Sequence, residues 1–266
     1  MADRSILFFD IDGTLIAEDA SRYLPDSARE AIKKARKAGH LAFINTGRVF
    51  INVDDFIRDV GFDGYVCGCG TFIQYQNQVL LHNELSRELC HEMAALAYDC
   101  GVFGLYEAMD ANGVDARIEV AGEAKELIAY FKSMGKRFMT DVTAPDFYFD
   151  KFTGWFDDNA DIVRFRKEVE REFTYIPRGT HFCEIVPKGF SKATGIEFLL
   201  KYFNIPWENS YAFGDSNNDL PMLEYVKNSV VMGESDDTIK EKASFVTKSV
   251  REDGLYHAME HYGLLG

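Results

Sequence analysis

Short apolar runs alternate with helix-forming segments in the first part of the chain. The apolar runs cover about residues 6–10, 41–45 and 64–67. Continuous hydrophobicity of this kind predicts strands that are buried on both faces of a sheet. Between the first two runs, residues 26–38 are rich in good helix formers, and Gly39 stands at the expected C-terminal cap. Alternating strands and helices predict right-handed crossovers and a parallel sheet.

The pattern changes between about residue 84 and residue 187. Helices are expected at about 86–98, 123–134 and 161–172, interspersed with short apolar runs that predict an antiparallel sheet. Strands are expected there at about 102–106, 116–120, 152–156 and 181–186. The sequence therefore predicts a doubly wound parallel-sheet α/β core, made of residues 1–83 and 188–266, with an α+β domain inserted at 84–187.

Two carboxylates stand two positions apart at the end of the first predicted strand. Side chains alternate along a strand, so a regular strand would aim Asp10 and Asp12 to the same side. Gly13 then allows the backbone to turn. Two like charges at the end of a buried strand repel each other and are costly to desolvate unless a cation or a proton lies between them. Taken alone, the same pattern also fits a solvated turn at a strand end.

Three later segments also place polar side chains at the end of a strand or the start of a helix. They are residues 46–48 after the second predicted strand, 188–192 at the start of a helix, and 214–219 after a strand at 210–213. Ligands of doubly wound sheets bind beyond the carboxyl ends of the strands, so these segments are expected to meet there. The cluster would hold Asp10, Asp12, Thr46, Lys192 and Asp215. Hard oxygen ligands without sulfur predict magnesium.

These four segments, in this order, resemble the motifs of the haloacid dehalogenase-like (HAD) phosphatases. The closer resemblance is to the Cof-type sugar-phosphatase branch, which carries a large α+β cap of type IIB between the second and third motifs. The resemblance covers essentially the whole chain, and it implies that residues 84–187 form a cap over the site. Asn45 departs from the pattern, because many relatives have a small residue before the threonine.

The resemblance also implies a role for each residue. Asp10 would be the nucleophile that forms an aspartyl-phosphate, and Asp12 would be the general acid and then the general base. Mg²⁺ would be held by Asp10, the backbone carbonyl of Asp12, and Asp215. The phosphate contacts would be Thr46, Gly47, Lys192 and Asn218. Lys192 would also hold Asp10 ionised. Asn218 and Asp219 would orient Lys192 and metal-bound water.

Substrate specificity is expected to come from residues of the inserted domain that reach over the leaving group. The first candidates are Glu184, on the strand that re-enters the core, and Arg48, which is also typical of a helix start. Arg178, His181 and Trp155 are further candidates. Each has a structural alternative, in which Trp155 packs the domain's own core and Arg178 is solvated.

These observations predict a magnesium-dependent phosphatase that hydrolyses a small phosphorylated metabolite, with a sugar phosphate as the leading candidate. One alternative is a phosphotransferase that resembles phosphomannomutase, in which the aspartyl-phosphate passes to a second sugar hydroxyl. Another is a regulatory or binding protein without catalysis on the same fold. The presence of every residue needed for turnover argues against this last alternative, since binding alone would not require Asp12 or Lys192.

Composition restricts the partners and the location. Lys and Arg number 29 against 43 Asp and Glu, and the net charge of −14 argues against nucleic-acid or anionic-membrane surfaces. No apolar stretch approaches the roughly 20 residues that span a bilayer, and the N-terminus leads straight into the first predicted strand, without a signal peptide. Five cysteines without zinc spacing favour the cytoplasm, and Cys67 and Cys69 are expected to pack near the core. We expect a monomer or small homo-oligomer.

Overall fold

The computed structural model describes residues 4–120 and 122–266. The chain folds into two compact units. The first, here the core unit, comprises the chain up to Gly47, Asp54–Leu81 and Ser191–Gly266, and the second, here the inserted unit, comprises Arg48–Val53 and His82–Phe190. Each unit has its own sheet and its own hydrophobic core. The short segment Arg48–Val53 lies with the inserted unit, although it follows a strand of the core unit directly.

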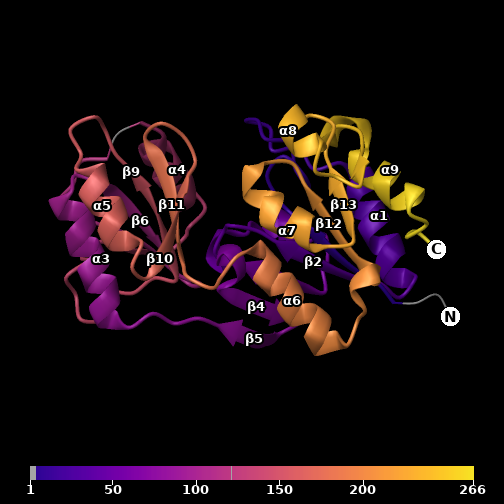
Figure 1. Ribbon diagram of the computed structural model, residues 1–266, viewed down its shortest axis with the longest axis horizontal. Helices are drawn as coiled ribbons and strands as arrows, with labels where there is room; N and C mark the ends of the chain where they lie inside the picture. The colour runs from indigo at the N-terminus through magenta and orange to yellow at the C-terminus, as the bar shows by residue number, and fades with distance from the viewer. Residues whose placement is uncertain (1–3, 121) are drawn as a thin grey trace. The chain divides into compact units, whose positions relative to one another are not determined.

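The core unit is built on an eight-stranded sheet in the order β14-β13-β12-β1-β2-β3-β4-β5 (Figure 1). The strands from β14 to β3 pair in parallel, and β4 pairs antiparallel with β3. Strand β1 is therefore central, with β2 and β12 as its neighbours. The bounds are β1 Ile6–Phe9, β2 Leu41–Asn45, β3 Gly64–Cys67, β4 Phe72–Tyr75, β5 Gln78–His82, β12 Ser210–Gly214, β13 Asn228–Val231 and β14 Phe245–Val246.

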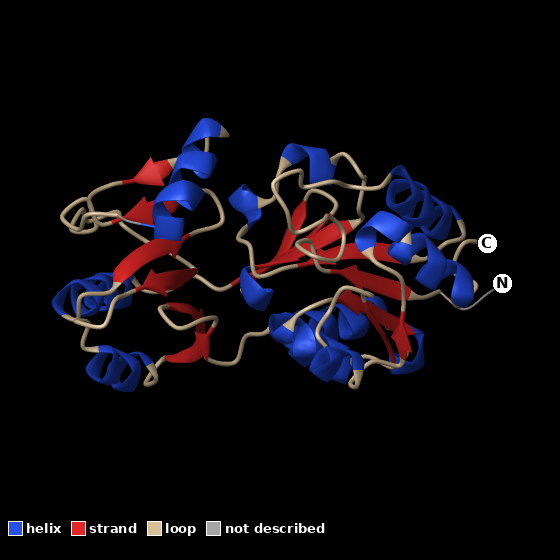
Figure 2. Cartoon of the chain, turned by 90° about the horizontal axis from the view of Figure 1, so that it is seen from above, coloured by secondary structure: helices blue, strands red, loops and turns tan. Residues whose placement is uncertain are grey.

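Helices cover both faces of this sheet, as Figure 2 shows. Apolar side chains of α6 and α7 pack with Ile6, Phe8 and Phe43 on one face, while α1 packs against β2 and α9. The four residues that α1 buries recur at the spacing of one helical face, namely Ala28, Ala31, Ile32 and Ala35. The helices are α1 Asp26–Lys37, α2 Asp55–Arg58, α6 Lys192–Phe203, α7 Leu220–Tyr225, α8 Asp237–Lys240 and α9 Gly254–His261. The predicted doubly wound core is thus confirmed.

The inserted unit holds a six-stranded sheet in the order β10-β11-β9-β6-β7-β8. Helices α3 and α5 contribute to a large aromatic core on one face of this sheet. Helix α4 packs with Phe103 and Leu105 of β6, whose side chains belong to a separate apolar cluster. The bounds are α3 Arg87–Asp99, β6 Phe103–Glu107, β7 Asn112–Val114, α4 Gly122–Ser133, β8 Phe138–Met139, β9 Lys151–Trp155, α5 Ile162–Val169, β10 Phe173–Pro177 and β11 Phe182–Pro187.

The strand predicted at 116–120 is wrong. The strand in this region is β7, which ends at Val114, and a turn follows it. The turn forms because the Asp115 carboxylate accepts a hydrogen bond from the Arg117 amide at 3.0 Å, a local bond that competes with a strand ladder. The alternating apolar residues Ile118 and Val120 pack against the cluster that contains α4, so their pattern reflects packing on a helix.

The five cysteines, all within the described residues, are buried and form no disulfide. Cys67 ends β3 and Cys69 follows it, so the prediction that this pair packs near the core is confirmed. Burial raises the pKa of the Cys67 thiol to about 12, which keeps it protonated and unreactive at neutral pH. Within residues 4–120 and 122–266, no helix combines the length and the apolar character needed to cross a membrane.

Replacing Gly195 by alanine tests the close packing of α6 on the sheet. A methyl group at this position would collide with the Val66 side chain. We expect Gly195→Ala to lower the free energy of unfolding by about 1–3 kcal/mol, because overpacking outweighs the gain of up to about 1 kcal/mol in helix propensity. Urea unfolding measures the change. Glu197→Ala on the same helix is the matched control, and a Gly195→Ala protein as stable as this control would contradict the packing argument.

Candidate active site

The turn after β1 presents Asp10 at the centre of the core sheet. The Asp10 amide donates to the Phe213 carbonyl of β12 at 3.0 Å, so the strand pairing extends to this residue, which is 4% exposed. Gly13 has φ +78°, a conformation that glycine adopts readily. A side chain at Gly13 would also collide with the carboxylate of Asp215. Gly13 therefore allows the turn after β1 to lie close to the Asp215 carboxylate.

Lys192 is the first residue of α6 and is buried against two carboxylates. Its Nζ donates to Asp10 Oδ1 at 2.6 Å and to Asp219 Oδ1 at 2.5 Å. Ser191 caps the helix by accepting from the Thr194 amide, which fixes where the helix begins. Asn45 Nδ2 donates to the Lys192 carbonyl at 3.0 Å, so the residue that departs from the family pattern supports the lysine backbone.

The loop after β12 holds the remaining carboxylates. Asp219 Oδ2 accepts from the amides of Asp215 and Ser216 at 2.9 and 3.2 Å, which ties the loop to the helical turn that follows it. Gly214 lies so close to Asp219 that a methyl group at this position would clash. Thr14 Oγ1 donates to Asp215 Oδ1 at 2.7 Å and so orients this carboxylate.

Carboxylate oxygens of Asp10, Asp215 and Asp219 lie within 4.8 Å of one another. This group differs in one member from the expected magnesium ligands. The expected set contains the backbone carbonyl of Asp12 in place of Asp219, whose expected role is to orient Lys192. Asp219 Oδ1 accepts a hydrogen bond from Lys192 Nζ, and its Oδ2 accepts from two backbone amides. All donors in the group are hard oxygens, without histidine or cysteine, so the residues fit a magnesium ion.

Burial gives these carboxylates an unusual protonation balance. Burial first, and then repulsion from Asp219, raises the pKa of Asp10 to about 7 despite the attraction of Lys192. Burial and then repulsion from Asp10 and Asp219 raise the pKa of Asp215 to about 8. Burial opposes the charge on Lys192, but its two carboxylate partners outweigh burial and raise the pKa of the ammonium. With three carboxylates against one ammonium, the fully ionised cluster has a net charge of −2, which favours a bound cation.

The other predicted phosphate contacts lie at the ends of neighbouring segments of the core unit. Thr46 follows β2 and is buried, and its carbonyl accepts a hydrogen bond from the Cys69 amide. Gly47 is the next residue and is half-buried. Asn218 lies in the turn after Asp215, where its Oδ1 accepts from Ser216 Oγ at 2.6 Å. These positions agree with the expected meeting of strand ends, and their contacts with substrate remain predictions.

Comparison with known proteins decides the family. Residues 7–259 match the model of a family described as haloacid dehalogenase-like hydrolase. The chain belongs to this family. It is 30% identical to the "Putative phosphatase YkrA" of Bacillus subtilis over 99% of both chains, and 23% identical to the 5-amino-6-(5-phospho-D-ribitylamino)uracil phosphatase YitU of the same species over 97% of both.

Solved structures share the fold of this chain. A hypothetical protein of Geobacillus kaustophilus has a TM-score of 0.82 at 26% identity, covering 98% of this chain and 99% of the other. A protein described as the HAD subclass IIB sugar phosphatase BT4131 has a TM-score of 0.80 at 24% identity, with the same coverage. The predictions of a HAD-like fold and of a phosphatase of this family are confirmed.

The two specificity candidates belong to the inserted unit. Glu184 on β11 is 5% exposed, and its Oε1 accepts from Lys151 Nζ at 2.6 Å. Lys151 also lies 3.1 Å from Glu107 Oε2, so the ammonium bridges two buried carboxylates. Arg48 Nη1 donates to the Asn52 carbonyl at 3.2 Å within its own short segment. Both side chains therefore have structural partners within their unit.

Sequence reasoning missed three supporting residues of the HAD protein. Thr14 follows Gly13 in the turn after β1, and its hydroxyl orients Asp215. Lys151 had no local signal, because its two carboxylate partners lie on the neighbouring strands β6 and β11. Asn52 exchanges hydrogen bonds with Asn112 at 2.8 and 3.0 Å and so ties segment 48–53 to β7. The sequence shows only an asparagine shortly after Thr46-Gly47-Arg48, and its burial in this contact is visible in the structure alone.

The raised carboxyl pKa values predict how metal-free protein responds to pH. Folded values of about 7 and 8 lie above the ordinary 3.8, so their contribution to stability is full below about pH 3.8 and is lost as pH rises through 7 and 8. In chelator, we expect Asp215→Asn to lose less stability than wild type between pH 5 and pH 9, by on the order of 1–3 kcal/mol. Urea unfolding across this pH range measures it.

Asp59→Asn, at an exposed position of the core unit, is the control for removing one carboxylate. It should follow the wild-type pH dependence. If Asp215→Asn also follows the wild-type curve, the buried cluster does not carry the excess charge that its geometry implies.

Proposed function

We propose that this HAD protein is a magnesium-dependent phosphatase that hydrolyses a small phosphorylated metabolite through an aspartyl-phosphate intermediate. The contact of Lys192 with both Asp10 and Asp219 carries the proposal, because it combines a nucleophile with a buried cation. A purely structural ion pair would not need a third carboxylate, Asp215, beside it. That excess carboxylate is what a magnesium site requires.

The chemistry follows from the roles of the residues. Asp10 attacks phosphorus, and Lys192 compensates its charge so that the carboxylate stays ionised in a buried position. Asp12 gives its proton to the leaving alkoxide and then takes a proton from the water that attacks the aspartyl-phosphate. Phosphate leaves and Asp10 is restored. Thr46, Gly47 and Asn218 contact phosphoryl oxygens in this proposal. Asp10, the backbone carbonyl of Asp12, and Asp215 would hold magnesium, which would supply positive charge against the transferring group.

A sugar phosphate or a related phosphorylated polyol is the leading substrate class. One structural relative is described as a sugar phosphatase, and three curated relatives are named for a ribitylamino-uracil phosphate. Both names describe phosphate on a polyhydroxylated carbon chain. These relatives are 23–25% identical to this chain, so they support the class and not a single compound.

In this proposal residues 84–187, which make up most of the inserted unit, act as the cap of a core formed by residues 1–83 and 188–266. Glu184 and Arg48 select the leaving group. A cap that excludes water would favour the alternative phosphotransferase reaction, and release of free phosphate distinguishes the two. Five buried cysteines without a disulfide agree with work in the reducing cytoplasm on a small metabolite.

Asp10→Asn tests the covalent mechanism. We expect no detectable phosphate release from a panel of sugar phosphates, nucleotides and phosphorylated cofactors, because an amide oxygen is a poor nucleophile. The wild-type protein should release phosphate with magnesium and stop in chelator. Asp59→Asn should keep the wild-type rate. Turnover by a folded Asp10→Asn protein would contradict the aspartyl-phosphate.

Glu184→Gln separates specificity from structure. Glutamine keeps the shape but removes the charge that faces Lys151, so we expect a loss of stability of about 1–3 kcal/mol, below the cost of fully breaking a buried pair. We also expect a changed ranking of substrates across the panel at an unchanged magnesium requirement. Glu170→Gln, an exposed position of the same unit, is the control. A lower unfolding midpoint with the original ranking would assign Glu184 a structural role only.

A further inference from the structure

The carboxyl end of β2 carries a buried amide to which the proposed reaction assigns no role. Asn45 is fully buried, and half of its side chain is satisfied, because Nδ2 donates to the Lys192 carbonyl at 3.0 Å. Its Oδ1 is also buried, but it accepts no hydrogen bond from the described residues 4–120 and 122–266. A buried polar atom without a partner is rare in folded proteins and lowers stability, so this amide calls for a reason other than folding.

The register of β2 aims this side chain at α6. Leu41, Phe43 and Asn45 are alternate residues of the strand and so point to one side of the sheet. Leu41 and Phe43 pack there with Ile196 of α6. Asn45 therefore stands on the sheet face that α6 covers, and its amide bonds the backbone of the residue with which this helix begins.

The turn after β3 supports the same helix start by close packing. Gly70 has φ +92°, and a methyl group on it would lie 2.5 Å from the Ser191 carbonyl. The turn thus lies directly against the residue before Lys192. Steric contact from Gly70 and a directional hydrogen bond from Asn45 therefore hold two consecutive carbonyls at the start of α6.

The ammonium of Lys192 depends on this backbone position. Its Nζ donates to Asp10 at 2.6 Å and to Asp219 at 2.5 Å, so movement of the backbone would lengthen one or both bonds. The side chain also leaves from the first turn of a helix, whose amides lack partners within the helix and which frays more readily than its middle. A misplacement of about 1 Å can lower a catalytic rate by about 10²-fold, even from outside the reacting groups.

We propose that Asn45 is a positioning residue that acts on the reaction through Lys192. Its hydrogen bond holds the ammonium where it compensates the charge of Asp10, and the unpaired Oδ1 is the loss of stability that this placement carries. The inference rests on the function proposed above and adds no bond to its chemistry. Because Asn45 departs from the family pattern, this support is particular to the present chain.

Asn45→Ala separates positioning from folding. The substitution removes the unpaired Oδ1 together with the hydrogen bond, so we expect urea unfolding with nearly the wild-type midpoint. On the best substrate of the panel, kcat should fall at least about 10-fold while KM stays within about 3-fold, since the bond acts on the reacting groups and not on the leaving group. A purely structural role predicts the reverse, a lower midpoint with normal kcat for the folded protein.

The Lys192 ammonium reports its own position without turnover. In protein labelled with ¹⁵N at the lysine Nζ atoms, the signal of Lys192 is identified by its loss in Lys192→Arg, which keeps a cation beside the carboxylates. We expect Asn45→Ala to shift this signal and to speed the exchange of its protons with water at least about 10-fold, because local opening of the ion pair becomes easier. Both changes are measured by ¹H–¹⁵N correlation spectra of the full chain.

Ser210→Ala is the matched control in the same sheet. Ser210 is buried at the start of β12, donates to the Trp207 carbonyl at 2.6 Å and accepts from the Lys227 amide at 3.1 Å, so its loss also removes buried hydrogen bonds. This variant should keep the wild-type kcat and the wild-type Lys192 signal. An unchanged Lys192 signal or a wild-type kcat in Asn45→Ala would overturn the proposal. If wild type turns over no compound, the proposed function fails separately, and the Lys192 signal alone decides whether Asn45 holds the lysine.

Discussion

The buried ammonium of Lys192 is the interaction on which the core unit's chemistry depends. It joins Asp10, 182 residues away in the sequence, to Asp219, and so connects the end of β1, the start of α6 and the loop after β12. Loss of the ammonium would leave buried carboxylates without a cation, which costs about 3–5 kcal/mol where one partner of a buried pair is removed. The close approach of these segments also explains the two glycines, because Gly13 and Gly214 leave room for Asp215 and Asp219.

One lysine does not balance three carboxylates. The consequence is visible in the raised pKa values of Asp10 and Asp215, which share burial as their main cause. A protein selected for stability alone would have replaced one of these carboxylates by an amide. The retained charge is a local cost that a metal site and a nucleophile both explain, and functional sites are where such costs are expected. The same reasoning does not extend to Glu107, Lys151 and Glu184. There the Lys151 ammonium pairs with both carboxylates within the sheet and neutralises one of the two negative charges.

The sequence predicts the core better than the inserted unit, for physical reasons. Residues at the carboxyl ends of parallel strands converge by a general rule, so the approach of Asp10 to Asp215 could be predicted without knowledge of the pairing. The Lys151 contacts depend on antiparallel register between strands, which no local pattern reports. At 116–120 the apolar residues do alternate, but they do not form a strand. The segment begins with a turn held by Asp115, and its apolar side chains pack against the cluster that contains α4. Tertiary contacts also decide that Arg48–Val53 joins the inserted unit, since Asn52 finds its amide partner on β7.

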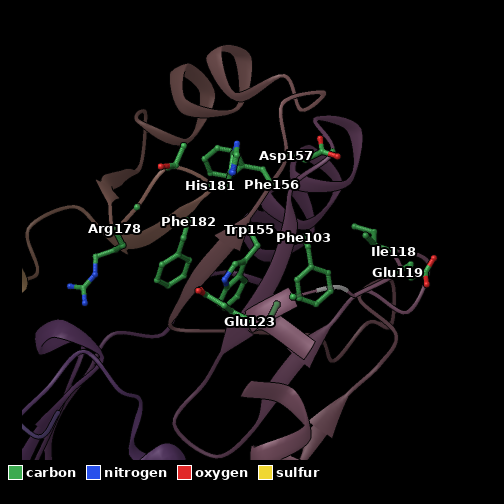
Figure 3. Close-up of a pocket in the computed structure, with 15 residues that line it drawn as sticks. Phe103, Ile118, Glu119, Glu123, Trp155, Phe156, Asp157, Arg178, His181 and Phe182 are labelled. Atoms are coloured by element: carbon green, nitrogen blue, oxygen red, sulfur yellow. The ribbon is translucent and has the colours of Figure 1, made fainter. Parts of the chain in front are cut away.

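The period of two along β9 explains how one sheet face of the inserted unit carries two kinds of chemistry. Lys151, Thr153 and Trp155 point to the same side, and each lies opposite different residues of the neighbouring strands. At the Lys151 end the neighbour Glu107 and the nearby Glu184 satisfy the charge, which leaves little for a ligand to gain. At the Trp155 end the neighbours are aromatic, the indole N–H is unpaired, and a cavity remains. The charged end of this face therefore has its charges paired within the sheet, whereas the aromatic end stacks one ring on the next beside a cavity (Figure 3).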